Sequence, residues 1–140
     1  MFTSGLFSGK IVAVSGGGSG IGLTIARQFM QYGATVFIAS RKEERLQKAL
    51  ETLAPLGTCH AFAMDIRNPD EVERFAQYIK DQYGRLDILV NNVWGGYEHF
   101  YDGTHFWEEQ GFWTVPLDRW DKSFAAGVRA HYVASVLAAP

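Results

Sequence analysis

The chain has 140 residues, 47% of them hydrophobic and 20% charged, and a formal net charge of −2 at pH 7. These values are typical of one globular domain, and the scattered basic residues exclude the basic patch that binding to nucleic acid or to an anionic membrane requires. Cys59 is the single cysteine, which excludes an internal disulfide, and no apolar run has the length of a membrane span or the pattern of a secretory leader. We therefore expect a cytoplasmic protein that does not associate with membranes.

The first part of the chain alternates short apolar runs with amphipathic stretches. Residues 11–15 predict a buried strand, and residues 20–32 predict a helix that ends at Gly33. A second strand is expected at residues 35–40. The helix after it is expected to end near Gly57, and its apolar stripe consists of Leu46, Leu50 and Leu53.

The same alternation continues through the middle of the chain. A weaker third strand is expected at residues 60–64. Asn68 is suited to cap the next helix, with Pro69 at its first position and Gly84 at its end. Residues 86–91 predict a fourth strand. Strand–helix alternation with short connections indicates βαβ units, and hence an α/β fold with a doubly wound parallel sheet and right-handed crossovers.

Residues 93–116 interrupt this rhythm with an aromatic-rich insertion. Its metal-capable side chains match no compact metal motif, so we expect no metal site there; they are His99, Asp102, His105, Glu108 and Glu109. A last helix is expected from Pro116 or Leu117 toward Ala139. One face of that helix is formed by Trp120, Phe124, Val128 and Tyr132.

The first strand runs into a glycine-rich turn that leads directly into a helix. Glycines there permit a tight turn and let the backbone approach a pyrophosphate, and the helix N-terminus offers unpaired N–H groups and a positive dipole end. The glycine spacing is G-x-x-x-G-x-G, and no Lys-Ser/Thr pair follows, which disfavours a nucleoside-triphosphate loop. A turn that binds nothing is the alternative. The expected cofactor-binding residues are Ser15, Gly16, Gly18, Ser19, Gly20, Ile21 and Gly22.

The end of the second strand bears on which dinucleotide is bound. In dinucleotide-binding folds a carboxylate there selects NAD, whereas an arginine accommodates the 2′-phosphate of NADP. This chain has Ser40, Arg41 and Lys42 there, and no acid. Solvated charges at the start of a helix are the alternative, although cations are disfavoured near a helix N-terminus. We therefore expect Ser40 and Arg41 to bind NADP in preference to NAD.

Several blocks of the sequence, in order between residues 8 and 95, resemble the classical short-chain dehydrogenase/reductase family. They are the glycine-rich turn, the pair Asp65-Ile66 after the third strand, and Asn91-Asn92 at the end of the fourth. The resemblance implies a Rossmann-like domain in which Asp65 and Ile66 contact the adenine and Asn92 stabilises the sheet and lines the cofactor cleft. The alternatives are that Asp65 begins a helix cap and that both asparagines are turn residues.

The tail of the chain resembles a narrower branch of that family, typified by dehydrogenase/reductase member one. The pattern consists of Phe112, Trp113, Pro116, Trp120 and Asp121, followed by Gly127, Val128, Arg129, His131 and Tyr132. Most members of the family have, at the position of Gly127, an Asn that holds a proton-relay water. A glycine lacks that side-chain amide, so any relay would have to be built differently.

The resemblance also implies the chemistry of the full-length protein. Family members reduce a carbonyl or oxidise an alcohol of a small molecule, using a Tyr whose pKa is lowered by a Lys four residues further on. None of the six tyrosines of this chain is followed by Lys at that spacing. The aromatic insertion is expected to pack over the opening for the substrate.

We therefore expect residues 1–140 to be the N-terminal NAD(P)-binding part of an NADP-dependent oxidoreductase. The domain would be truncated after about four strands and the fourth helix, lack catalytic residues and be inactive alone. The alternative is a non-catalytic dinucleotide-binding or interaction module that is complete at this length. An open edge at the fourth strand and an uncovered last helix predict a homo-oligomer.

Overall fold

A computed structural model describes residues 3–95 and 111–140 of the chain, and four parallel strands lie at its centre. They are β1 (Ile11–Ser15), β2 (Thr35–Ser40), β3 (Cys59–Ala63) and β4 (Ile88–Val90). The strand order is β3-β2-β1-β4, so the chain winds outward in one direction to β3 and then crosses to the other side of β1. This confirms the expected parallel α/β fold and places a topological switch point between β1 and β4.

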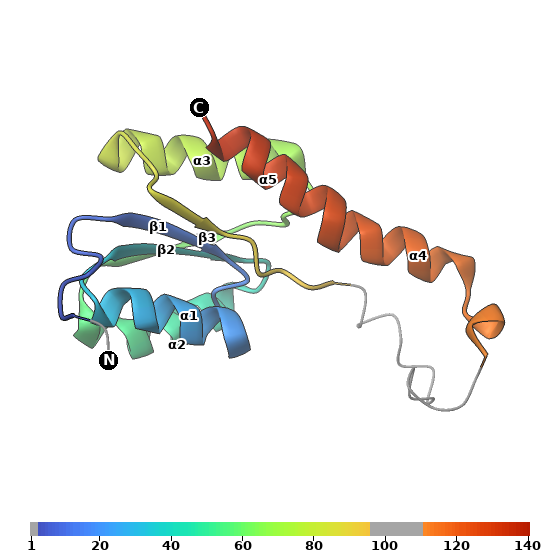
Figure 1. The fold of residues 1–140 in the computed structure, drawn as a ribbon, viewed down its shortest axis with the longest axis horizontal. Coiled ribbons are helices and arrows are strands. Elements are labelled where there is room, and N and C mark those ends of the chain that lie inside the picture. The colour runs from blue at the N-terminus through green and yellow to red at the C-terminus, as the bar shows by residue number, and fades with distance from the viewer. Residues whose placement is uncertain (1–2, 96–110) are drawn as a thin grey trace.

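Helices cover both faces of this sheet (Figure 1). On one face lie α1 (Gly20–Gln31) and α2 (Glu43–Leu53), the latter continued by the short 3₁₀ turn η1 (Ala54–Leu56). On the other lie α3 (Pro69–Tyr83) and α5 (Ala130–Ala138). No helix in residues 3–95 and 111–140 is both long enough and apolar enough to cross a membrane.

Alternate side chains of the two central strands form two separate cores. Ile11 and Ala13 of β1 pack with the apolar faces of α3 and α5. Val12 and Val14 point the other way and pack with those of α1 and α2. Every side chain of β1 is buried, as expected for a strand with helices on both faces. Cys59 packs half-buried against the second core, and burial raises the pKa of its thiol to about 12, so it behaves as an apolar side chain.

The expected helix ends are confirmed by their backbone geometry. Gly33 and Gly84 follow α1 and α3 with φ values of 96° and 70°, in the left-handed region that favours glycine. The Asn68 side chain caps α3 by accepting a hydrogen bond from the backbone N–H of Asp70, with Pro69 at the first helical position.

The strand boundaries differ from the expected ones at β3 and β4. β3 begins and ends one residue earlier than expected, and β4 covers only Ile88–Val90 of the expected residues 86–91. The polar residues on either side of β4 account for the difference, because their hydrogen bonds lie outside the regular ladder. The Asp87 carboxylate accepts from the N–H of Ile11 at 2.8 Å, and the N–H of Asn92 donates to the Ser15 hydroxyl at 3.1 Å.

The last helix is continuous but not uniform. It begins as α4 (Leu117–Phe124), passes through a π-helical turn, η4 (Ala125–Arg129), and continues as α5. A short 3₁₀ turn, η3 (Phe112–Thr114), precedes it. No residue of α4 is buried, and the helix projects past the sheet (Figure 1).

The aromatic stripe expected on this helix lies on its exposed face. Trp120 is 66% exposed, Val128 61% and Tyr132 70%, and the Trp120 and Phe124 rings stack with their centres 4.2 Å apart. The buried positions are instead the alanines Ala126, Ala130 and Ala134. Small side chains therefore face the sheet, and the large apolar ones face outward.

Candidate functional site

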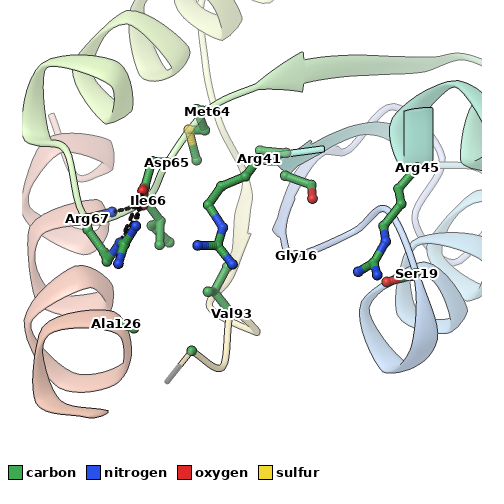
Figure 2. Close-up of a pocket in the computed structure, with 13 residues that line it drawn as sticks. Gly16, Ser19, Arg41, Arg45, Met64, Asp65, Ile66, Arg67, Val93 and Ala126 are labelled. Carbon is green, nitrogen blue, oxygen red and sulfur yellow. Dashed lines mark hydrogen bonds and ion pairs between the residues drawn. The ribbon is translucent and has the colours of Figure 1, made fainter. Parts of the chain in front are cut away.

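A cavity of about 140 Å³ opens where the strands end, at the switch point of the sheet (Figure 2). Ligands of open α/β sheets bind at this place, because the loops after neighbouring strands diverge there. The cavity brings together predicted residues from three separate blocks of the sequence. They are Gly16 and Ser19 of the glycine-rich turn, Ser40 and Arg41 after β2, and Asp65 and Ile66 after β3.

The glycine-rich turn is closely packed at two of its glycines. A Cβ at Gly22 would lie 2.2 Å from the backbone oxygen of Gly16, and one at Gly17 would lie 2.6 Å from the Ile38 side chain. Gly16 has a φ of 72°, and its N–H donates to the oxygen of Ala39 at 2.8 Å. The turn is thus held against the end of β2 by contacts that only glycine permits.

The N-terminus of α1 faces outward from this turn with its first N–H groups available. Ser19 is the N-cap residue, its side chain makes no capping hydrogen bond, and the first helical turn contains no acidic residue. Ile21, in that first turn, is 74% exposed. Unpaired N–H groups and the positive end of the helix dipole suit this position to a phosphate group.

Ser15 and Asn92 connect the glycine-rich turn to β4. The Ser15 hydroxyl donates to the oxygen of Val90 at 3.1 Å and accepts from the N–H of Asn92. The Asn92 side-chain amide donates to the oxygen of Ser15 at 3.3 Å. The two residues therefore position the turn from behind, and neither lines the cavity.

Asn91 points in a different direction and contacts the last helix. Its side-chain nitrogen donates to the hydroxyl of Ser135 at 3.0 Å, and that hydroxyl donates to the oxygen of His131 at 2.8 Å. Asn91 thus joins the end of β4 to α5 and, like Asn92, does not line the cavity.

Asp65 lies at the opposite wall of the cavity, paired with Arg67. The Arg67 Nε donates to both carboxylate oxygens, at 3.0 and 3.1 Å. These hydrogen bonds hold the pKa of the Asp65 carboxyl below its ordinary value, and the charge of Arg41 acts in the same direction. The N-cap of α3 is Asn68, so the Asp65 carboxylate does not cap that helix but pairs with Arg67 at the wall of the cavity.

Several residues of the site were not predicted from the sequence. Arg45, on the first turn of α2, lines the cavity together with Arg41, and no local sequence pattern indicates it because Arg41 lies before the helix begins. Gly95 and Ala126 bring η4 against the cavity, because a Cβ at Gly95 would lie 2.5 Å from that of Ala126. No sequence pattern indicates that approach.

Gly127 lies in the π-turn itself. Within residues 3–95 and 111–140, no atom outside the helix itself lies within 4 Å of the point where a Cβ there would be placed. π-Turns are frequent at functional sites, and the position where the family resemblance implies an Asn is therefore an open one.

The described residues contain no group of three or more His, Cys, Asp or Glu side chains arranged to hold a metal ion. The metal-capable side chains of the aromatic insertion, His99 to Glu109, lie outside the described residues. The expectation that this insertion packs over a substrate opening concerns the same residues outside the described part of the chain.

A parallel sheet with a glycine-rich turn at its switch point, leading into a helix N-terminus, is the fold of a dinucleotide-binding domain. A family model of the short chain dehydrogenases matches residues 10–140. The chain belongs to the short-chain dehydrogenase family.

Individual relatives support the same assignment. Dehydrogenase/reductase SDR family member 1 of Mus musculus is 36% identical over 133 residues, which cover 94% of this chain and 41% of the relative. The Pseudomonas aeruginosa RhlG/NADP complex superimposes with a TM-score of 0.79 at 29% identity, covering 99% of this chain and 50% of that one. A 7α-hydroxysteroid dehydrogenase complexed with NADH superimposes with a TM-score of 0.81 at 26% identity, and the match covers 100% of this chain and 51% of that one. The chain therefore spans about half the length of these proteins or less, and the resemblance to the member one branch is confirmed.

Proposed function

We propose that this chain is the cofactor-binding part of an NADP-dependent oxidoreductase that reduces a carbonyl group or oxidises an alcohol of a small molecule. The observation that carries the proposal is the cavity at the switch point, where the chain after β2 contributes the guanidinium of Arg41 and no carboxylate. A carboxylate there would repel a 2′-phosphate, whereas an arginine attracts it.

The residues present fit a dinucleotide. The close packing at Gly17 and Gly22 holds the glycine-rich turn beside the N-terminus of α1, where a pyrophosphate would bind. Ser40 and Arg41 would hold the adenosine ribose and its phosphate, and Asp65 and Ile66 would contact the adenine. When bound, the nicotinamide would supply or accept the hydride.

The relatives do not decide between the two dinucleotides. RhlG is described with NADP, and the 7α-hydroxysteroid dehydrogenase with NADH. The preference for NADP therefore depends on this chain's own charges at the cavity. Arg41 and Arg45 lie beside one acidic residue, Asp65, which already pairs with Arg67.

We also propose that residues 1–140 bind the cofactor without turning over substrate. None of the six tyrosines is followed by Lys at i+4, so the general acid that the resemblance implies is absent from these residues. A second candidate function, a dinucleotide-binding module without catalysis, is favoured by the same observation.

Partners and location form a further part of the proposal. The exposed apolar side chains of the last helix form a stripe through which two copies would associate; the outward stripe consists of Leu117, Trp120, Phe124, Val128, Tyr132 and Val136. A single cysteine and no disulfide fit a cytoplasmic location.

The experiment is a fluorescence titration of purified 1–140 with NADPH and with NADH, followed by a turnover assay on aldehydes and ketones. Saturable binding that is tighter for NADPH, with no turnover, is the expected result. Equal affinity for both dinucleotides would contradict the NADP assignment, and absence of binding would contradict the function as a whole. A protein extended to contain a Tyr-x-x-x-Lys segment that turns over substrate would distinguish the oxidoreductase from the non-catalytic module.

A further inference from the structure

Three arginines line the cavity, and their surroundings differ. Arg67 is paired with Asp65 through two hydrogen bonds from its Nε. Arg41 lies near the same carboxylate and lowers its pKa. The Arg45 side chain makes no hydrogen bond or ion pair within the described part of the chain, although the residue lines the same cavity.

Arg45 lies close to the N-terminus of α2. The helix begins at Glu43 after an N-cap residue, Lys42, whose side chain makes no capping hydrogen bond. Arg45 is therefore in the first turn, together with Glu43 and Glu44, and the helix N-terminus adds to the positive potential that a bound anion would meet there.

Arg45 also lies close to the glycine-rich turn. A Cβ at Gly18 would be 3.6 Å from the Cβ of Arg45 and 3.4 Å from that of Ser40. Figure 2 shows the Arg45 side chain extending to Ser19, while that of Arg41 extends toward Val93. The two arginines thus line the same cavity from two sides, Arg41 from the end of β2 and Arg45 from the first turn of α2.

We propose that Arg45 is a specificity-determining residue that binds the 2′-phosphate of NADP from the α2 side, opposite Arg41. This inference depends on the proposed NADP-binding function. Two guanidinium groups match the charge and oxygen geometry of a phosphate dianion, because each offers a planar pair of donors. Arg45 therefore increases the affinity for a ligand that carries a 2′-phosphate and not the affinity for 5′-AMP, which has none.

The test compares two probes that differ by that one phosphate, adenosine 2′,5′-bisphosphate and 5′-AMP, by calorimetric titration of 1–140 at low ionic strength. Arg45→Ala is expected to weaken binding of the bisphosphate by about tenfold or more, with 5′-AMP unchanged within about twofold. Arg45→Lys should give an intermediate loss, because it keeps the charge and loses the paired donors. Lys48→Ala removes a charge from the next turn of α2, at a residue that does not line the cavity, and is expected to change neither affinity.

The outcomes separate this inference from the function on which it depends. If wild type prefers the bisphosphate and Arg45→Ala keeps the full preference, the role of Arg45 is overturned and NADP binding stands. An equal loss for both probes in Arg45→Ala overturns the specificity role as well. If wild type binds the two probes equally, or binds neither, the NADP-binding function is overturned together with the inference. Circular dichroism of each variant establishes that the exposed substitution leaves the fold intact.

Discussion

The side-chain nitrogen of Asn92 lies 2.5 Å from the point where a Cβ on Gly22 would be placed. The same nitrogen donates to the backbone oxygen of Ser15, so it cannot withdraw without releasing the glycine-rich turn from β4. The first turn of α1 and the end of β4 therefore approach each other to a distance that only a glycine at position 22 permits.

Gly22→Ala is expected to destabilise the domain by about 1–3 kcal/mol, because the Gly16 carbonyl or Asn92 must shift to admit the methyl group. It should also weaken NADPH binding, because the turn that approaches the pyrophosphate moves. Urea unfolding measures the first effect and fluorescence titration the second. Gly127→Ala is the matched control: an added Cβ there meets no atom from another part of the described structure, so the change should be neutral or stabilise by up to about 1 kcal/mol. Equal stabilities of Gly22→Ala and wild type would contradict the packing described for the turn.

Arg41→Asp is expected to reverse part of the cofactor preference. The substitution removes a donor to the 2′-phosphate and introduces a carboxylate that repels it and suits a ribose 2′-hydroxyl. We expect the ratio of NADPH to NADH affinity to fall by about tenfold to a hundredfold, measured by parallel titrations of 1–140. Lys48→Asp makes the same change of charge in the second turn of α2 and should leave the ratio near the wild-type value. An unchanged ratio in Arg41→Asp would refute the role given to this arginine.

Asp87 is expected to make stability depend on acid pH. Its carboxylate accepts hydrogen bonds from the N–H of Ile11, from Lys10 Nζ and from Arg85 Nε, which lower its pKa from 3.8 to about 2. The pKa is depressed in the folded state, so the ionised Asp87 carboxylate stabilises the folded protein. Its contribution to the free energy of unfolding is complete above the unfolded-state pKa and is lost as the pH falls toward 2.

Thermal unfolding between pH 7 and pH 2 tests this expectation. Asp87→Asn should be less stable than wild type at pH 7 and should lose less stability on acidification, so that the two profiles converge near pH 2. Asp121→Asn removes a carboxylate from the exposed helix α4 and should follow the wild-type profile. If the profiles of Asp87→Asn and wild type are parallel throughout, the acid-labile contribution does not belong to Asp87.

Val128→Lys is expected to reduce self-association of the chain. The substitution places a charge in the middle of the exposed apolar stripe, where contact with a second copy would bury it. Size-exclusion chromatography with light scattering should show the apparent mass of wild type rising with concentration and that of the variant remaining closer to one chain. Gln47→Lys, at an exposed position of α2, adds the same charge elsewhere and should behave as wild type. Wild type that remains monomeric at all concentrations would contradict the proposed interface.

Local patterns in the sequence were enough to predict most of the secondary structure. The strand at residues 35–40 is predicted to the residue, because a continuous apolar run between two helical patterns has no other interpretation in a βαβ unit. Both ends of α3 could be predicted from single residues. Asn68 caps the first turn with Pro69 at the first helical position, and Gly84 adopts the left-handed conformation that ends the helix.

Features that depend on contacts between distant segments could not be predicted in this way. The close approach of Gly95 to Ala126 and the contact of Gly17 with Ile38 depend on how elements pack in three dimensions. Arg45 becomes recognisable as a site residue only when α2 is placed beside the glycine-rich turn. The outward direction of the aromatic stripe also follows from packing, because small alanines on the opposite side let the helix approach the sheet.

The π-turn η4 has a consequence for how the last helix tolerates changes in length. A π-turn holds one residue more than an α-helical turn, and each residue rotates an α-helix by about 100°. Deleting one residue from Ala125–Arg129 would convert the turn to a regular one and rotate α5 relative to α4 by that angle. The alanine face of α5 and the side of α4 that continues it would then no longer point in the same direction. The extra residue thus sets the direction in which the buried alanines of α5 point relative to the exposed side chains of α4.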